Sequence, residues 1–136
     1  MIFAFPFILL VFLAYNAVVF TQGVGALNDV ILSVDMVSGS VWTLTVSDIL
    51  ITAGLFLLFI EVIKATRTGA GTILDHLLST FVFIACLVEF IVVRQASTST
   101  FFLIMVIAFI DVVAGYSVSI RSARRDLSVG YGGEGL

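Results

Sequence analysis

This chain of 136 residues has very few of the residue types that form disulfides, metal sites and active sites in soluble proteins. It has one cysteine, one proline and one histidine, and Asp, Glu, Lys and Arg together make up 11% of it. The lone Cys86 excludes an internal disulfide and a thiolate metal cluster. We find no nucleophile with a base, no metal-ligand spacing and no phosphate-binding loop. The sequence therefore predicts no enzyme activity, no metal and no cofactor, and it offers no basic surface for nucleic acid.

Apolar residues dominate the composition of the chain. They make up 61% of the chain, and the mean hydropathy of +1.26 lies outside the range of soluble domains. Four apolar runs, about 2–20, 48–64, 73–94 and 100–121, approach the roughly 20 residues that a helix needs to cross a bilayer. We predict an all-α membrane protein with four transmembrane helices. Residues 1–126 form one transmembrane domain, and the glycine-rich stretch 127–136 is a flexible cytoplasmic tail.

The segment between the first two runs is not helix-like. Residues 30–46 carry β-branched residues on both sides of Ser38-Gly39-Ser40, a pattern that predicts a short β-hairpin. An isolated hairpin is only marginally stable. We therefore expect it to rest on lipid headgroups, on the helix ends or on a neighbouring subunit. Ser47 is the predicted N-cap of the second span, with Asp48 in its first turn.

The distribution of basic residues predicts the orientation. Five of the six lie on one side of the predicted spans and one lies on the other. The positive-inside rule then puts both termini in the cytoplasm and the hairpin outside. The five are Lys64, Arg67, Arg121, Arg124 and Arg125, and the sixth is Arg94.

Asp111 interrupts the fourth run near its centre, with ten residues of the stretch 101–120 before it and nine after it. A carboxylate at mid-membrane costs at least about 2.5 kcal/mol on insertion scales, so it indicates an ion path, a proton relay or a partner-binding role. No basic residue lies near that depth when positions are counted along the spans. We expect Asp111 to be protonated, hydrated or paired with another molecule.

Two more carboxylates lie in the spans at other depths. At about 1.5 Å per residue, Glu61, Asp111 and Glu89 form a staggered series with steps of about 8 Å. These steps are too long for direct hydrogen bonds, but a water chain could join the carboxylates into a proton or cation path.

The alternative is that each carboxylate has a local partner. Glu61 precedes Lys64 by three helical positions, a common ion pair, and His76 and Tyr116 fall at a similar depth on other spans. Glu89 shares its level with Asn16, whose amide requires an interhelical hydrogen bond in lipid.

A stripe of small residues shares the face of Asp111. Ala108, Gly115 and Ser119 follow at three- and four-residue steps, a pattern that lets two helices approach closely. The stripe either packs inside the chain against Gly54 or forms a dimer seam.

A second group of residues suits the lipid headgroups. Arg121, Arg124 and Arg125 follow the last span and predict an anchor to anionic lipid, or a docking site for a cytoplasmic partner. Trp42 suits the membrane interface.

Three pieces of the chain carry a resemblance. VSGSVWTLTVSD, FIEVIKATRTG and SARRD, in this order and spacing, resemble an uncharacterised family of small four-span bacterial inner-membrane proteins, mostly alphaproteobacterial. The resemblance covers about residues 35–126. It implies the topology and the location, and it implies no chemistry because no activity is assigned to that family.

These patterns lead to two functional hypotheses. The first is a non-enzymatic accessory or scaffold subunit of the bacterial inner membrane, surrounded by lipid, which packs against itself as a homo-oligomer or against another membrane protein. The second is an oligomeric proton or cation channel, or a proton-coupled transporter, that uses Asp111 with Glu61 and Glu89. A four-span chain of this size cannot easily enclose a pathway alone, so the second hypothesis requires an oligomer.

Overall fold

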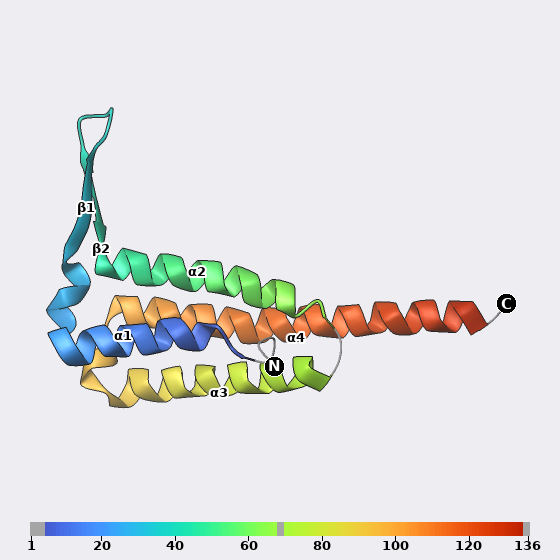
Figure 1. Cartoon of the computed structure of the whole chain (residues 1–136). Helices are drawn as coiled ribbons and strands as arrows, with labels where there is room; N and C mark the ends of the chain where they lie inside the picture. Colours follow the sequence, from blue (N-terminus) through green and yellow to red (C-terminus); the bar gives the residue numbers. More distant parts are fainter. Residues whose placement is uncertain (1–4, 68–69, 135–136) are drawn as a thin grey trace.

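Successive helices run in opposite directions in a group of four, and a two-stranded hairpin leaves one end of them (Figure 1). This is a computed structural model that describes residues 5–67 and 70–134. The chain forms α1 (Ile8–Gln22), a 3-10 turn η2 (Val24–Asn28), β1 (Val30–Asp35), β2 (Val41–Thr45), α2 (Val46–Lys64), α3 (Ala70–Val92), a 3-10 turn η3 (Arg94–Ala96) and α4 (Ser99–Glu134). The predicted helical architecture with one hairpin is confirmed. α2, α3 and α4 are long and apolar enough to cross a membrane.

α1 is an apolar helix of 15 residues, shorter than the predicted span 2–20. Residues 2–4 of that span lie outside the described part, and the helix begins after Pro6, not before it. The difference has a physical reason. The Phe7 N–H donates to Glu61 and the Phe5 carbonyl accepts from Lys64, so these backbone groups bind side chains of α2 and do not start a helix.

α1 contacts each of the other three helices. Its buried residues, Ile8, Val11, Tyr15 and Val19, recur at helical spacing on one face. The Tyr15 side chain is fully buried, and its hydroxyl donates to the Gln95 carbonyl over 2.7 Å. It also lies 2.7 Å from Thr98 Oγ1. α1 is thereby fixed to the turn that precedes α4.

The two strands pair antiparallel around a turn at Gly39, whose φ of 90° suits glycine. β2 runs directly into α2 without a loop, and Thr45 is the N-cap of α2. Thr45 and Asp48 form a capping box, in which each side chain binds the backbone N–H of the other residue. The prediction of Ser47 as N-cap is wrong. The Ser47 hydroxyl instead lies 2.6 Å from Thr100 Oγ1 on α4.

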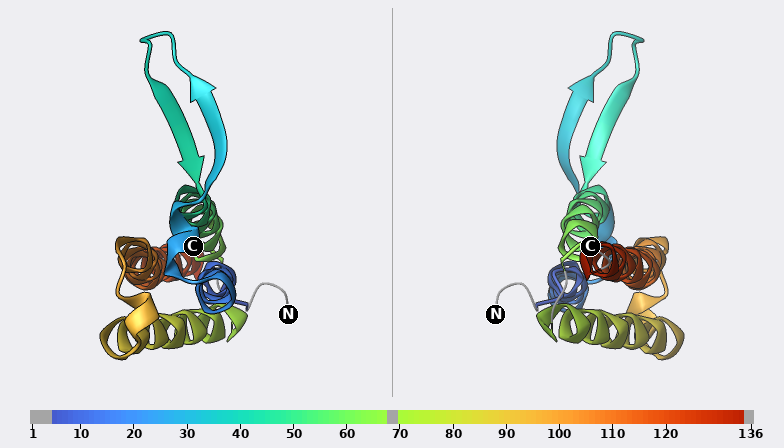
Figure 2. Two further views of the ribbon diagram at one scale, coloured as in Figure 1. Left: turned by 90° about the vertical axis from the view of Figure 1, so that its left-hand side faces the viewer. Right: turned by 90° about the vertical axis from the view of Figure 1, so that its right-hand side faces the viewer.

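α4 is longer than the predicted span 100–121 and continues to Glu134. The helix therefore covers residues 127–134, because extending an existing helix costs far less than starting one. The flexibility of this tail stays a prediction. α4 projects well past the other helices, and α1 begins toward the same end of the bundle at which α4 leaves it (Figure 1). Seen along the bundle, the hairpin stands off to one side of the helices (Figure 2).

Candidate functional site

Six buried polar side chains gather between α2, α3 and α4. Each is at most 7% exposed. α3 contributes three of them from one face, because positions separated by three or four residues are neighbours on a helix. We call this group the carboxyl cluster, and it consists of Glu61 and Lys64 on α2, Asp75, His76 and Ser79 on α3, and Asp111 on α4.

Lys64 is the ammonium group of the cluster. Its Nζ lies 3.1 Å from Glu61 Oε1 and 3.3 Å from Asp75 Oδ1. It also lies 4.3 Å from the centroid of the Phe7 ring, a cation–π contact. One positive charge is therefore shared between two carboxyl groups on different helices. The ion pair of Glu61 with Lys64, one of the two sequence alternatives, is present.

The segment before α1 closes the cluster on one side. Lys64 Nζ donates to the Phe5 carbonyl over 2.6 Å, and the Phe7 N–H donates to Glu61 Oε1 over 2.7 Å. Pro6, which has no N–H to satisfy, is buried between them. In a longer α1, the Phe5 carbonyl and the Phe7 N–H would belong to the first turn of the helix. Here they position Lys64 and Glu61 instead.

Asp111 is 4% exposed and belongs to this cluster. It interacts electrostatically with Glu61, Asp75 and Lys64. The Ser79 hydroxyl approaches the Asp111 carboxyl group but lacks the geometry of a full hydrogen bond. The Lys64 ammonium group acts electrostatically on the Asp111 carboxyl group, although its ion pairs in the described part of the chain are with Glu61 and Asp75. Counting residues along each span ignored the reach of the Lys64 side chain, which points into the bundle and not toward its end.

His76 packs against α4. Its ring centroid lies 5.1 Å from that of Tyr116, and the missing side chain of Gly115 makes room for the ring. The Tyr116 hydroxyl lies 3.2 Å from Thr80 Oγ1, whose hydroxyl donates to the His76 carbonyl. His76 Nε2 is buried without a hydrogen-bond partner in the described part of the chain, and so is Ser79 Oγ.

Glu89 lies apart from the carboxyl cluster. Its Oε2 accepts a hydrogen bond of 3.2 Å from Asn16 Nδ2 on α1. Glu89 follows Ser79 by ten positions on α3, which is about 15 Å of helix. The structure thus brings Glu61 and Asp111 together and leaves Glu89 with Asn16. The space between the two places is filled by an apolar core that includes Val82, Cys86, Ile104, Ile107 and Ala108.

The two alternatives for the small-residue stripe, packing against Gly54 and a dimer seam, stay predictions. Gly54 faces Ile107, where an added Cβ would lie 3.1 Å from Cδ1, and Gly115 faces His76. Ala108 is buried and Ser119 is half-buried.

The predicted headgroup residues lie at two ends of the molecule. Arg121 and Arg124 are exposed on α4, and the side chain of Arg125 lies outside the described part. Trp42 is exposed on the hairpin.

Sequence reasoning missed Asp75 and Ser79 as members of the site, and it placed His76 only at the depth of Glu61. Their spacing of one and then three residues places them on one face of α3, which was the available signal. No group of three or more His, Cys, Asp or Glu side chains among the described residues is arranged to hold a metal ion. Comparisons of the chain with known protein families, with curated proteins and with solved structures find no match. The resemblance of residues 35–126 to small four-span inner-membrane proteins stays a prediction.

Proposed function

We propose that this chain is an accessory protein of the bacterial inner membrane, without catalysis of its own, that binds protons at the carboxyl cluster. α2, α3 and α4 would cross the bilayer, accompanied by the shorter α1. The end of the bundle that carries Lys64 and Arg121 would face the cytoplasm, in line with the positive-inside rule. The cluster would then lie in the cytoplasmic half of the membrane.

The charge of the cluster is the observation that carries the proposal. Glu61, Asp75 and Asp111 would contribute three negative charges against one positive charge on Lys64, a net charge of −2 in a buried site. An uncompensated buried charge costs about 3–5 kcal/mol. Two bound protons would make the cluster neutral. The unpartnered His76 Nε2 and Ser79 Oγ offer an additional proton acceptor and a hydroxyl that can turn toward either form of Asp111.

The apolar core favours proton binding over conduction within one chain. A conducting path would have to continue from Asp111 toward Glu89, yet Ile104 and Ile107 are buried between them. Protons would therefore enter and leave on the side of Lys64. This favours a pH-responsive subunit over a channel within one chain.

The experiment is infrared difference spectroscopy of the reconstituted protein between about pH 5 and pH 8, an interval on both sides of neutral pH. The carboxylic C=O band should change with pH in the wild type. Asp111→Asn should reduce that change, because it removes the carboxyl group of Asp111. Glu89→Gln alters a carboxyl group outside the cluster, so the contribution of Asp111 to the band should still be present in this variant. A pH response that Glu89→Gln abolishes and Asp111→Asn leaves intact would place the proton elsewhere and overturn the proposal.

A proton-flux measurement tests the prediction that the protein does not conduct protons. Vesicles that contain the wild-type protein should hold a pH gradient as long as protein-free vesicles do. Rapid loss of the gradient that Asp111→Asn abolishes would instead identify a proton conductor.

A further inference from the structure

The hairpin has two chemically different faces. Its register pairs Leu32 with Leu44 and Val34 with Trp42. Because side chains alternate between the faces of a strand, these four lie on one face, which we call the apolar face. The cross-strand pairs of the opposite face are Ser33 with Thr43 and Asp35 with Val41. That face therefore carries three polar side chains and one apolar side chain, Val41, which is 60% exposed.

The apolar face is open. Leu32 is 49% exposed, Val34 is 38% exposed and Trp42 is 47% exposed. Apolar surface on an arm of this kind marks a contact with lipid or protein.

The direction of the hairpin is fixed by its connection to α2. β2 ends at Thr45 and α2 begins at Val46, with the capping box between them. The strands run across the direction of α2 and extend away from the helices (Figure 1). If α2 crosses the bilayer, the hairpin runs along the bilayer surface, at the level where α2 enters the lipid.

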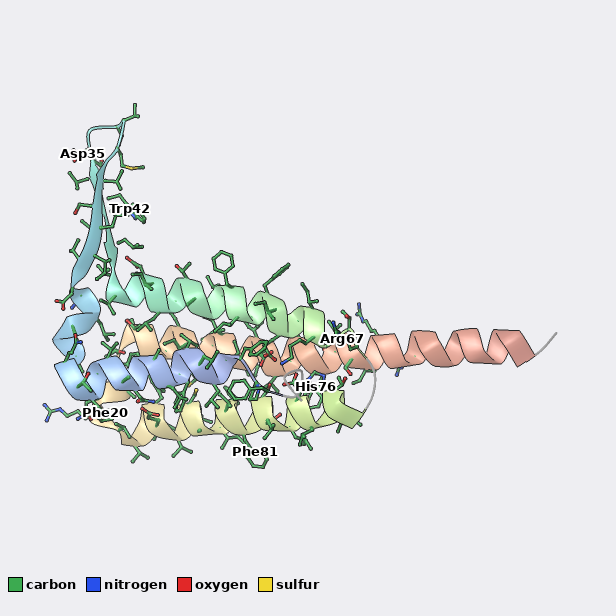
Figure 3. The ribbon with its side chains drawn as sticks, in the orientation of Figure 1. Phe20, Asp35, Trp42, Arg67, His76 and Phe81 are labelled. Carbon is green, nitrogen blue, oxygen red and sulfur yellow. The ribbon has the colours of Figure 1, made fainter. Side chains whose placement is uncertain are left out.

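The two faces are turned in opposite directions relative to that surface. Trp42 lies on the side of the hairpin along which α2 runs, and Asp35 lies on the other side (Figure 3). If α2 crosses the bilayer, the apolar face is therefore turned toward the lipid, and the opposite face is turned away from it.

We propose that the hairpin is an amphipathic arm that lies flat on the bilayer beside the bundle, with its apolar face in the interfacial region of the lipid. Strands β1 and β2 carry no Lys or Arg, and their one acidic residue, Asp35, is on the face that would meet water. Tryptophan is enriched at this depth because its ring is apolar and its N–H remains near polar headgroups. The proposal requires that α2 crosses the membrane, as in the proposed function, and it does not depend on the carboxyl cluster.

A second copy of the chain is the competing occupant. It would pair with the open edge of a strand, and the backbone groups of that edge point sideways within the plane of the hairpin. Edge pairing gives no reason for the apolar residues to gather on the face directed at the membrane. The separation of the faces therefore favours lipid.

Trp42 is the sole tryptophan of the sequence, so its fluorescence reports on the hairpin directly. The full-length protein would be placed at one copy per nanodisc of phosphatidylethanolamine and phosphatidylglycerol. We expect lipids brominated near the top of the acyl chain to quench the emission, and aqueous iodide to quench it weakly. Strong iodide quenching without lipid quenching would overturn the proposal. So would an emission that becomes protected from iodide only when several copies share a membrane.

Two matched variants test the faces. Val34→Asn, on the apolar face, should reduce quenching by brominated lipid at least about twofold, because it removes buried apolar area. Val41→Asn makes the same change on the opposite face and should leave the quenching unaltered; equal losses in both variants would contradict the assignment of the faces. Asp111→Asn should not affect Trp42, so the arm and the proton site can fail independently.

Discussion

Gly115 on α4 lies directly against His76 on α3, and a Cβ atom at position 115 would come within 3.2 Å of both Nδ1 and Cε1 of the imidazole. We predict that Gly115→Ala displaces the ring and lowers the free energy of unfolding. Overpacking costs about 1–3 kcal/mol, partly offset by the roughly 1 kcal/mol that alanine gains over glycine in a helix. Thermal unfolding in detergent measures the difference.

Gly54→Ala is the matched control for this change. Its Cβ would meet the tip of the Ile107 side chain at 3.1 Å, and a flexible methyl group can move where a packed ring cannot. We expect this variant to be as stable as the wild type or slightly more so. If both variants are equally stable, the packing of His76 against α4 is looser than described.

Removing Lys64 should make stability depend on pH. Lys64→Met leaves Glu61 and Asp75 without their ammonium partner. We predict a loss of about 3–5 kcal/mol near pH 8, where the carboxyl groups must be charged, and a smaller loss near pH 5, where protons replace the lost charge. The double variant with Glu61→Gln should recover part of the stability near pH 8. Chemical unfolding in mixed micelles at the two pH values measures these differences.

Arg94→Met controls for the loss of a positive charge. Arg94 is exposed in η3, so its replacement should change the stability by less than about 0.5 kcal/mol at either pH. A Lys64→Met variant that is no less stable than Arg94→Met would show that the ion pairs are not formed.

Tyr15→Phe should destabilise the attachment of α1. It removes a hydroxyl that donates to the Gln95 carbonyl and contacts Thr98. We expect a loss of about 1–3 kcal/mol, because a buried carbonyl loses its donor. Tyr116→Phe, whose hydroxyl has a single longer contact with Thr80, should cost less. Unfolding in mixed micelles compares the two variants, and the opposite order would contradict this role of Tyr15.

The orientation can be tested by labelling. A cysteine introduced at Ser40 in the hairpin turn should react with an impermeant maleimide in intact cells, and one at Ser128 should not. The native Cys86 is fully buried and gives a low background. The reverse pattern would invert the proposed topology and move the carboxyl cluster to the outer half of the membrane.

Local signals were enough to predict the hairpin and the helices from the sequence. Gly39 between two β-branched runs indicated the turn, and the apolar runs indicated α2, α3 and α4, because turn chemistry and hydropathy act over a few neighbouring residues. The cap of α2 was misplaced because Ser47 and Thr45 can both accept a backbone N–H. The reciprocal bond from Asp48 to the Thr45 backbone decides between them.

The carboxyl cluster could be predicted only in part. Glu61 with Lys64 followed from helical spacing, and the importance of Asp111 followed from its depth. That Lys64 also reaches Asp75 and the Phe5 carbonyl depends on how two helices and a terminal segment converge. No pattern within one helix contains that information, so sequence counting treated Asp111 as isolated.

α4 continues as one helix far beyond the carboxyl cluster. Ser99–Glu134 is one helix, and its 23 residues beyond Asp111 extend about 34 Å. A helix this short is stiff compared with its length, so a tilt of about 10° at Asp111 would swing the far end sideways by roughly 6 Å. If Asp111 gains a proton as proposed and α4 tilts in response, a small change beside Ser79 would become a displacement about as large as a side chain at the far end of the helix.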